Sequence, residues 1–412
     1  MDDMRRQSLF VDLVLYGVSA LFAGYTMWWS TLPSHQHWAA IAIGGYLPAA
    51  IVTVMLLGRY AVPATTRLWV AIGTGVAVSI VPLLAQAWQR VDGLAGRAQE
   101  EVVVVEDSAA RLLDTGSPYL DLSAIAALDD PLTGYNPYQP GMAVFGLPRA
   151  LFGDHWFTDA RVWFAIATFG VLAVALRLLK DAGAPTGAIV RAIQAVAVLP
   201  ITALTLATGG DDLPVLALAL LALTAAFVRR PVLAGVAIGL AAALKLFAWP
   251  VLVVLAFLAW RRGELRRYLP AALPIPVVTI TPVLITNADA LIANVIDFPS
   301  GNGLVTSPAA SPLPGYLLTQ HVPGGRFIAL GLLVAVACAM AVYLLRRPPA
   351  DAALVAAICA VGILAAILLM PATRFGYLLY PGVYAIWWWV LTDTADPNRR
   401  LTPATATGGA TA

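Results

Sequence analysis

Carboxylates gather in one polar segment of an otherwise apolar chain. Residues 89–161 hold 11 of the 23 Asp and Glu residues in the 412-residue sequence. Glu101, Glu106 and Asp107 are the candidates for a general base, which must reach the proton it removes and have a pKa near the working pH. An apolar interface raises the pKa of a nearby carboxyl group toward that range. The alternative is a solvated loop with ordinary surface charges, and spacing alone does not choose among the three.

Two cations elsewhere in the chain could hold a phosphate. Lys245 is the only lysine inside a predicted membrane span, where a charged side chain indicates a functional site unless it snorkels to the surface. Arg374 lies at the predicted non-cytoplasmic mouth of the last span. Its guanidinium group is suited to bidentate phosphate contacts. The two cations and the acidic segment would together serve transfer of a sugar from a lipid phosphate.

A pair of adjacent acids, Asp211 and Asp212, precedes another predicted helix. Either can cap that helix, and Pro214 fits its first turn. The alternative is that the pair positions a substrate hydroxyl. No cluster of His and Asp has the spacing of metal ligands, so the sequence predicts neither a metal nor a cofactor.

Aromatic side chains flank the same predicted surface. Tyr135 and Tyr138 lie in a segment rich in proline and glycine, and Tyr377 follows Arg374. Such residues suit an interfacial belt or a groove for a sugar ring or a lipid tail. His321, in a second predicted outer loop, is a weaker binding candidate.

The elements that must position these residues are membrane-spanning helices. The chain is 60% hydrophobic and 12% charged, whereas soluble domains carry about 25% charged residues. Apolar runs of about 20 residues recur, as a bilayer requires. We therefore predict an all-α polytopic membrane protein with about twelve transmembrane helices. The predicted spans are 8–29, 38–57, 68–88, 162–179, 188–207, 212–228, 232–246, 249–260, 268–287, 327–345, 352–370 and 375–392.

Basic residues at alternate loops predict the topology. Both termini are expected in the cytoplasm, and residues 89–161 and 288–326 form non-cytoplasmic loops. Residues 1–392 are predicted to be one domain in the cell inner (plasma) membrane, with a disordered tail at 393–412. Residues 232–260 lie between two basic clusters, so they should form a hairpin that turns near Trp249-Pro250. The net charge of +2 does not indicate a nucleic-acid partner.

Four segments carry a resemblance to a known family. Residues 101–119, 135–153, 209–250 and 373–381 resemble integral-membrane glycosyltransferase family 87. This is the group of actinobacterial mannosyltransferases that use polyprenol-phosphate-mannose, and it has the C-type membrane glycosyltransferase fold. The Arg-rich, Lys-poor composition also suggests an actinobacterium.

The resemblance implies a polyprenyl-phosphate sugar donor, a non-cytoplasmic active site and inversion at the anomeric carbon. Aligned on Ala109-Ala110-Arg111, the family's catalytic aspartate falls on Val102, so Glu101, Glu106 and Asp107 are ranked as bases in that order. The family's motif lysine falls on Lys245.

The predicted function is that of a membrane glycosyltransferase acting in cell-envelope biosynthesis. It would transfer a sugar, expected to be mannose, from a polyprenyl-phosphate donor to a lipid or glycan acceptor, with membrane lipids as further partners. The alternative is a secondary transporter or a flippase for lipid-linked sugars, because twelve spans with both ends inside are common in transporters. Against the alternative, the sequence has no visible repeat.

Overall fold

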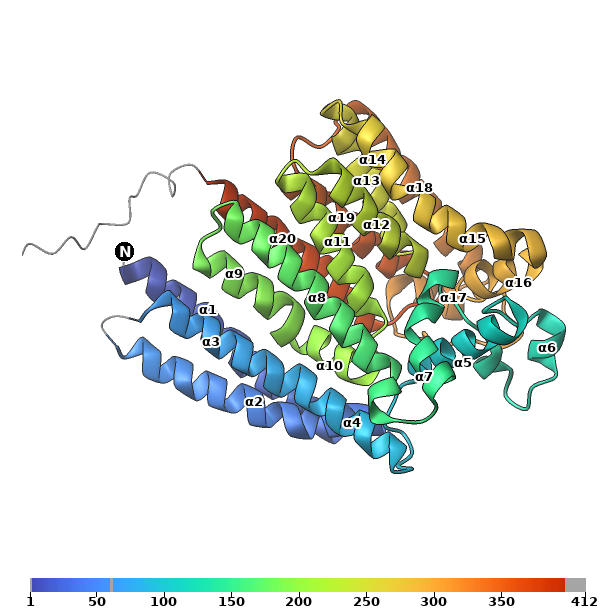
Figure 1. Cartoon of the computed structure of the whole chain (residues 1–412), viewed down its shortest axis with the longest axis horizontal. Helices are drawn as coiled ribbons and strands as arrows, with labels where there is room; N and C mark the ends of the chain where they lie inside the picture. The colour runs from blue at the N-terminus through green and yellow to red at the C-terminus, as the bar shows by residue number, and fades with distance from the viewer. Residues whose placement is uncertain (1, 60–61, 397–412) are drawn as a thin grey trace, which may run out of the picture.

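The regular structure of the chain is helical. The computed structural model describes residues 2–59 and 62–396, and within them the only β feature is an isolated bridge between Ala310 and Thr373. Long helices lie side by side, as Figure 1 shows. The prediction of an all-α protein is confirmed. The elements of the bundle are α1 (Asp2–Trp29), α2 (Pro33–Leu57), α3 (Ala64–Gly75), η1 (Val76–Ile80), α4 (Val81–Val91), α8 (Ala160–Asp181), α9 (Thr186–Ile193), η5 (Gln194–Val198), α10 (Pro200–Thr208), α11 (Asp212–Phe227), α12 (Pro231–Leu244), α13 (Ala248–Arg261), α14 (Leu265–Ala272), α15 (Pro274–Thr286), α18 (Gly325–Arg346), α19 (Ala352–Leu369) and α20 (Leu379–Ala395).

Helix length and hydropathy identify seven membrane-spanning candidates in the described part of the chain, or eight if the bent pair α9–α10 is one span. That pair bends by 44°. Each of the twelve predicted segments contains helix, but α11, α12 and α13 are shorter apolar helices. A multi-pass membrane protein is therefore confirmed, whereas the number twelve is not.

Helix α11 lies at the centre of the bundle. Its residues from Asp212 to Ala226 are all buried, as expected for a helix that is apolar on every side. Helices α8, α12, α13, α19 and α20 pack around it. The four N-terminal helices join this bundle through buried hydrogen bonds. The Tyr46 hydroxyl donates to the Val198 carbonyl at 2.7 Å, and the Ser79 hydroxyl donates to the Ala197 carbonyl at 2.8 Å.

Two glycines on α12 let α14 approach closely. A Cβ atom on Gly235 would lie 2.6 Å from the Tyr268 carbonyl oxygen, and one on Gly239 would lie 2.3 Å from that of Ala272. Small residues four positions apart are a common device for close packing of membrane helices. This contact fixes α12, and therefore the position of Lys245, which follows the last residue of that helix.

The hairpin predicted in residues 232–260 exists, but its turn lies earlier than Trp249-Pro250. Helix α12 ends at Leu244, the backbone of Lys245 is extended, and α13 begins at Ala248. The prediction was wrong because Pro250 falls in the first turn of α13. A helix tolerates proline there, since the first amide groups have no partner within the helix.

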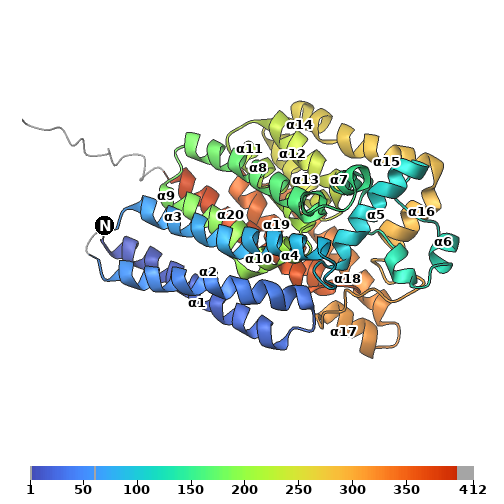
Figure 2. The same cartoon turned by 60° about the horizontal axis from the view of Figure 1, so that its bottom comes forward.

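Short helices gather at the end of the bundle away from the N-terminus (Figures 1 and 2). Both segments predicted as outer loops contribute to them. Of the predicted tail, residues 393–395 belong to α20, and 397–412 lie outside the described residues. The elements at this end are α5 (Glu100–Thr115), α6 (Leu122–Ala126), η2 (Pro131–Gly134), η3 (Pro140–Phe145), α7 (Leu147–Phe152), η4 (Trp156–Thr158), α16 (Ala288–Ile292), η6 (Ala293–Asp297), α17 (Pro314–His321) and η7 (Phe375–Leu378).

A buried network of charges attaches α5 to the bundle. The Glu106 carboxylate accepts hydrogen bonds from Arg90 at 2.6 and 2.9 Å and from the Ala160 amide at 3.0 Å. Arg90 also donates to Asp159 at 3.0 Å, and Asp159 pairs with Arg161 at 2.8 Å. Burial raises the pKa of Asp159, but the two arginines outweigh burial and hold that pKa below its usual value.

We predict that Glu106→Gln lowers the free energy of unfolding by about 3 kcal/mol, because it leaves the buried Arg90 and Arg161 to share the single carboxylate of Asp159. Thermal unfolding of the purified protein in detergent measures the effect. The matched control is Asp107→Asn, since Asp107 has a side chain that is 51% exposed and lies 3.8 Å from Arg111. Equal stability losses in the two variants would contradict a structural role for the Glu106 network.

Candidate active site

A cavity of about 280 Å³ opens at the end of the bundle where the short helices gather. Its wall comes from segments that are far apart in the sequence: the first turn of α5, the stretch before η3, the turn between α12 and α13, the loop after η6, and the stretch between α19 and η7. The residues used below that line it are Glu100, Glu101, Val103, Val104, Tyr135, Tyr138, Lys245, Phe247, Phe298, Arg374 and Tyr377.

Only one of the three predicted bases faces this cavity. Helix α5 presents Glu101 and Val104 to the cavity, while Val105 and Glu106 are buried on its other side. This follows from helical periodicity, which places positions 101 and 106 about 140° apart. Glu106 is occupied by the buried network, and Asp107 lies outside the cavity lining.

Glu101 forms an ion pair with Arg374 at the cavity wall. Arg374 has an extended backbone at the N-cap position of η7. The preceding residue is held by two backbone hydrogen bonds, from Thr373 to Ala309 at 2.8 Å and from Ser311 to Thr373 at 2.9 Å. The pair is partly accessible, because the exposed fractions of the Arg374 and Glu101 side chains are 30% and 16%. A ligand in the cavity can therefore reach both charges.

Lys245 sits deeper and is bound by both predicted acids. Its Nζ atom lies 2.6 Å from Asp211 Oδ2 and 2.5 Å from Asp212 Oδ1. The two carboxylates favour the charged ammonium form. The predicted capping of α11 is not formed, since Asp211 occupies the N-cap position without a side-chain cap. Gly210 supplies the positive φ of +92° that turns the chain there.

Aromatic rings surround this cluster. The rings of Tyr138 and Tyr377 lie 5.2 and 5.5 Å from Lys245 Nζ, within the range of a cation–π contact. Tyr135 stacks on Phe298 with ring centroids 4.1 Å apart. These tyrosines line the cavity as binding candidates. His321 is exposed at the end of α17 and is not among the cavity-lining residues.

Several residues of the site were not singled out from the sequence as binding or catalytic candidates. The Tyr380 hydroxyl donates to Asp212 Oδ1 at 2.7 Å, and Phe247 stacks on Tyr380 at 5.0 Å. The spacing of Tyr377 and Tyr380 on one helical face is the signal that could have identified Tyr380. Nothing in the sequence signals Phe298, because its stacking partner is 163 residues away.

A further polar contact connects the N-terminal helices to the site. The Gln99 amide group lies 2.8 Å from the His35 ring and accepts a hydrogen bond from the Thr208 hydroxyl at 3.1 Å. The Gln99 backbone amide donates to the Thr208 carbonyl at 2.9 Å. Helices α2 and α10 therefore hold the residue that precedes α5, and with it the start of the helix that carries Glu101.

Each of the two cations of the cavity already has a carboxylate partner, and the carboxylates, Glu100 included, outnumber the cations. Arg374 has Glu101, and Lys245 has two carboxylates. An incoming anion must therefore compete for a cation, and the more exposed Arg374 is the accessible one. No group of three or more His, Cys, Asp or Glu residues in the described ranges is placed to hold a metal ion.

Comparisons with known proteins identify the family. A model of glycosyltransferase family 87 matches residues 136–371, which is more than half of the chain. No curated protein matches. Two structures of ArnT from Cupriavidus metallidurans are similar at 20% sequence identity. The apo structure gives a TM-score of 0.46 and covers 82% of this chain, and the structure bound to undecaprenyl phosphate gives 0.48 and covers 81%.

The chain spans 61% of the length of ArnT in both comparisons. The family match confirms the resemblance found in the sequence, and the bundle of apolar helices agrees with it. The chain therefore belongs to glycosyltransferase family 87, and its apolar helices make it a multi-pass membrane protein.

Proposed function

We propose that the protein transfers a sugar, mannose, from a polyprenyl-phosphate-linked donor to a hydroxyl group of a lipid or glycan acceptor at the non-cytoplasmic face of the membrane. Membership of the family supports the reaction class. The observation that carries the proposal is that Glu101, Arg374 and Lys245 line one cavity, although they are distant in the sequence.

In the proposed reaction, Glu101 is the general base. Its carboxylate takes the proton of the acceptor hydroxyl, and the oxygen attacks the anomeric carbon opposite the phosphate. The new glycosidic bond forms as the bond from that carbon to the phosphate oxygen breaks, so the configuration inverts. The polyprenyl phosphate leaves with the bonding electrons, and the cations stabilise the charge that develops there.

Arg374 links donor binding to activation of the base. In the structure it pairs with Glu101. The phosphodiester of the donor offers this guanidinium group two oxygens in a matching bidentate geometry. When the donor binds, Arg374 turns to the phosphate and Glu101 is released to accept a proton.

Lys245 and its neighbours shape the inner part of the site. Two of the three ammonium N–H groups are used by Asp211 and Asp212, which leaves one for a donor oxygen. The Tyr380 hydrogen bond holds Asp212, so Asp211, Asp212 and Tyr380 are positioning residues for Lys245. The rings of Tyr135, Tyr138 and Tyr377 offer apolar faces to the sugar and the first isoprene units.

We predict that Glu101→Gln lowers the rate of sugar transfer by purified protein at least ~100-fold, the usual contribution of a general base. The assay follows transfer of labelled mannose from polyprenyl-phosphate-mannose to an endogenous lipid extract. Glu100→Gln is the control, because Glu100 lines the same cavity and loses the same charge. Full activity in Glu101→Gln would refute the assignment of the base.

Because the lipid phosphate is proposed to replace Glu101 as the partner of Arg374, substitutions of Glu101 and of Arg374 should have opposite effects on lipid binding. Glu101→Gln should tighten binding of polyprenyl phosphate about tenfold, which corresponds to ~1.4 kcal/mol, because the variant frees Arg374. Arg374→Gln should weaken binding by a similar factor. Microscale thermophoresis in detergent measures both dissociation constants. Unchanged or weaker binding of polyprenyl phosphate by Glu101→Gln would show that the lipid phosphate does not replace Glu101 as the partner of Arg374.

A further inference from the structure

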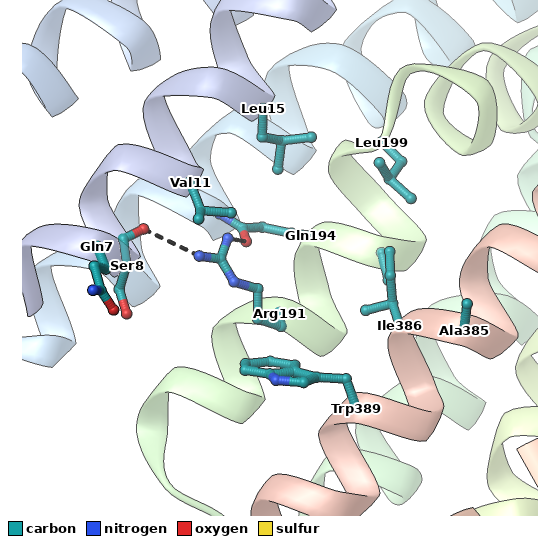
Figure 3. Close-up of a pocket in the computed structure, with 11 residues that line it drawn as sticks. Gln7, Ser8, Val11, Leu15, Arg191, Gln194, Leu199, Ala385, Ile386 and Trp389 are labelled. Atoms are coloured by element: carbon teal, nitrogen blue, oxygen red, sulfur yellow. Dashed lines mark hydrogen bonds between the residues drawn. The ribbon is translucent and has the colours of Figure 1, made fainter. Parts of the chain in front are cut away.

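A second cavity, of about 650 Å³, lies between α1, η5 and α20. Figure 3 shows Arg191 of α9 and Gln194 of η5 facing Ser8 and Val11 of α1, with Trp389 of α20 beside Arg191. Figures 1 and 2 place these helix segments toward the end of the bundle that holds the N-terminus, away from the candidate active site. The reaction proposed above does not use this cavity.

Two guanidinium groups beside this cavity share a single carboxylate. Asp12 pairs with Arg67 at 2.6 Å and with Arg191 at 2.6 Å, and the three side chains are 4%, 11% and 13% exposed. Gln194 also donates to Asp12 at 3.0 Å. Among the side chains that the structure describes, no second carboxylate reaches either arginine. Within those side chains the cluster therefore has one more positive than negative charge beside an apolar bundle, where such a charge is costly.

The wall of the cavity beyond Arg191 is apolar. Val11, Leu15, Leu199 and Ile386 line it. The opening arises where η5, a π-helical turn, is followed by the bend at Leu199-Pro200. π-helical turns are rare and often occur at functional sites. The result is a cavity with one cationic end, at Arg191, that continues along an apolar wall.

We propose that this cavity binds an anionic phospholipid from the leaflet at the N-terminal end of the bundle. The lipid phosphate lies against Arg191, which it approaches from the cavity, and supplies the missing negative charge. One acyl chain lies along Val11, Leu15 and Ile386. A free phosphate ion would satisfy the charge but would leave the apolar wall unused, so the shape of the cavity selects an amphiphile.

Native mass spectrometry of the full chain tests this proposal. The protein is reconstituted with an equimolar mixture of phosphatidylglycerol and phosphatidylcholine that have the same acyl chains. The lipid molecules that stay bound to the protein after it is released in the mass spectrometer are then counted. Wild type should retain phosphatidylglycerol preferentially, and Arg191→Gln should lower that retention at least fivefold. The control is Arg177→Gln, because Arg177 is 72% exposed and pairs only with Asp181 among the described residues.

A second variant keeps the test independent of the charge network. Val11→Trp fills the apolar wall and leaves Arg191 and Asp12 intact, so it should also abolish preferential retention. Equal retention of the two lipids by wild type, or unchanged retention in Val11→Trp, would overturn the proposal. Displacement of phosphatidylglycerol by millimolar inorganic phosphate would point to a free anion instead and would likewise overturn it. None of these outcomes depends on sugar transfer.

Discussion

The structure depends on the pairing of charges inside an apolar bundle. Removing a carboxylate or a guanidinium from water costs several kcal/mol, and the cost is recovered only where a partner is well placed. Each inward-facing cluster obeys this constraint in a different way. The Glu106 network is fully matched and fixes α5 to α4 and α8. At the candidate active site the Glu101–Arg374 pair is partly exposed, so a substrate can take one partner.

This distinction separates a structural carboxylate from the proposed catalytic carboxylate on one helix. Glu101 and Glu106 are five residues apart on α5, yet one opens onto the cavity and the other is 5% exposed in a network of arginines. Both have an arginine partner. Access from the cavity, not the presence of charge, decides which of them can meet an acceptor hydroxyl. The same criterion favours Arg374 over the deeper Lys245 as the first contact for a phosphate.

From the sequence, the lengths of the apolar runs and the positions of the charged residues allowed correct predictions. The apolar runs gave the helical membrane fold, and the intramembrane lysine and the outward arginine pointed to residues that line one cavity. Two features were not predicted correctly from the sequence. The turn of the hairpin was misplaced because Pro250 is tolerated in a first helical turn. The choice between Glu101 and Glu106 stayed open because it depends on the face of α5 that Arg90 and Asp159 approach from distant helices. Partners such as Phe298 and His35 are set by tertiary packing alone.

The central claim is that a lipid phosphate and Glu101 compete for Arg374. An electron cryomicroscopy structure of the protein with polyprenyl phosphate tests it most directly. The account predicts phosphate density in contact with Arg374, near Lys245, and a Glu101 carboxylate that has parted from the guanidinium group. Phosphate density elsewhere in the bundle, with the Glu101–Arg374 pair intact, would contradict it.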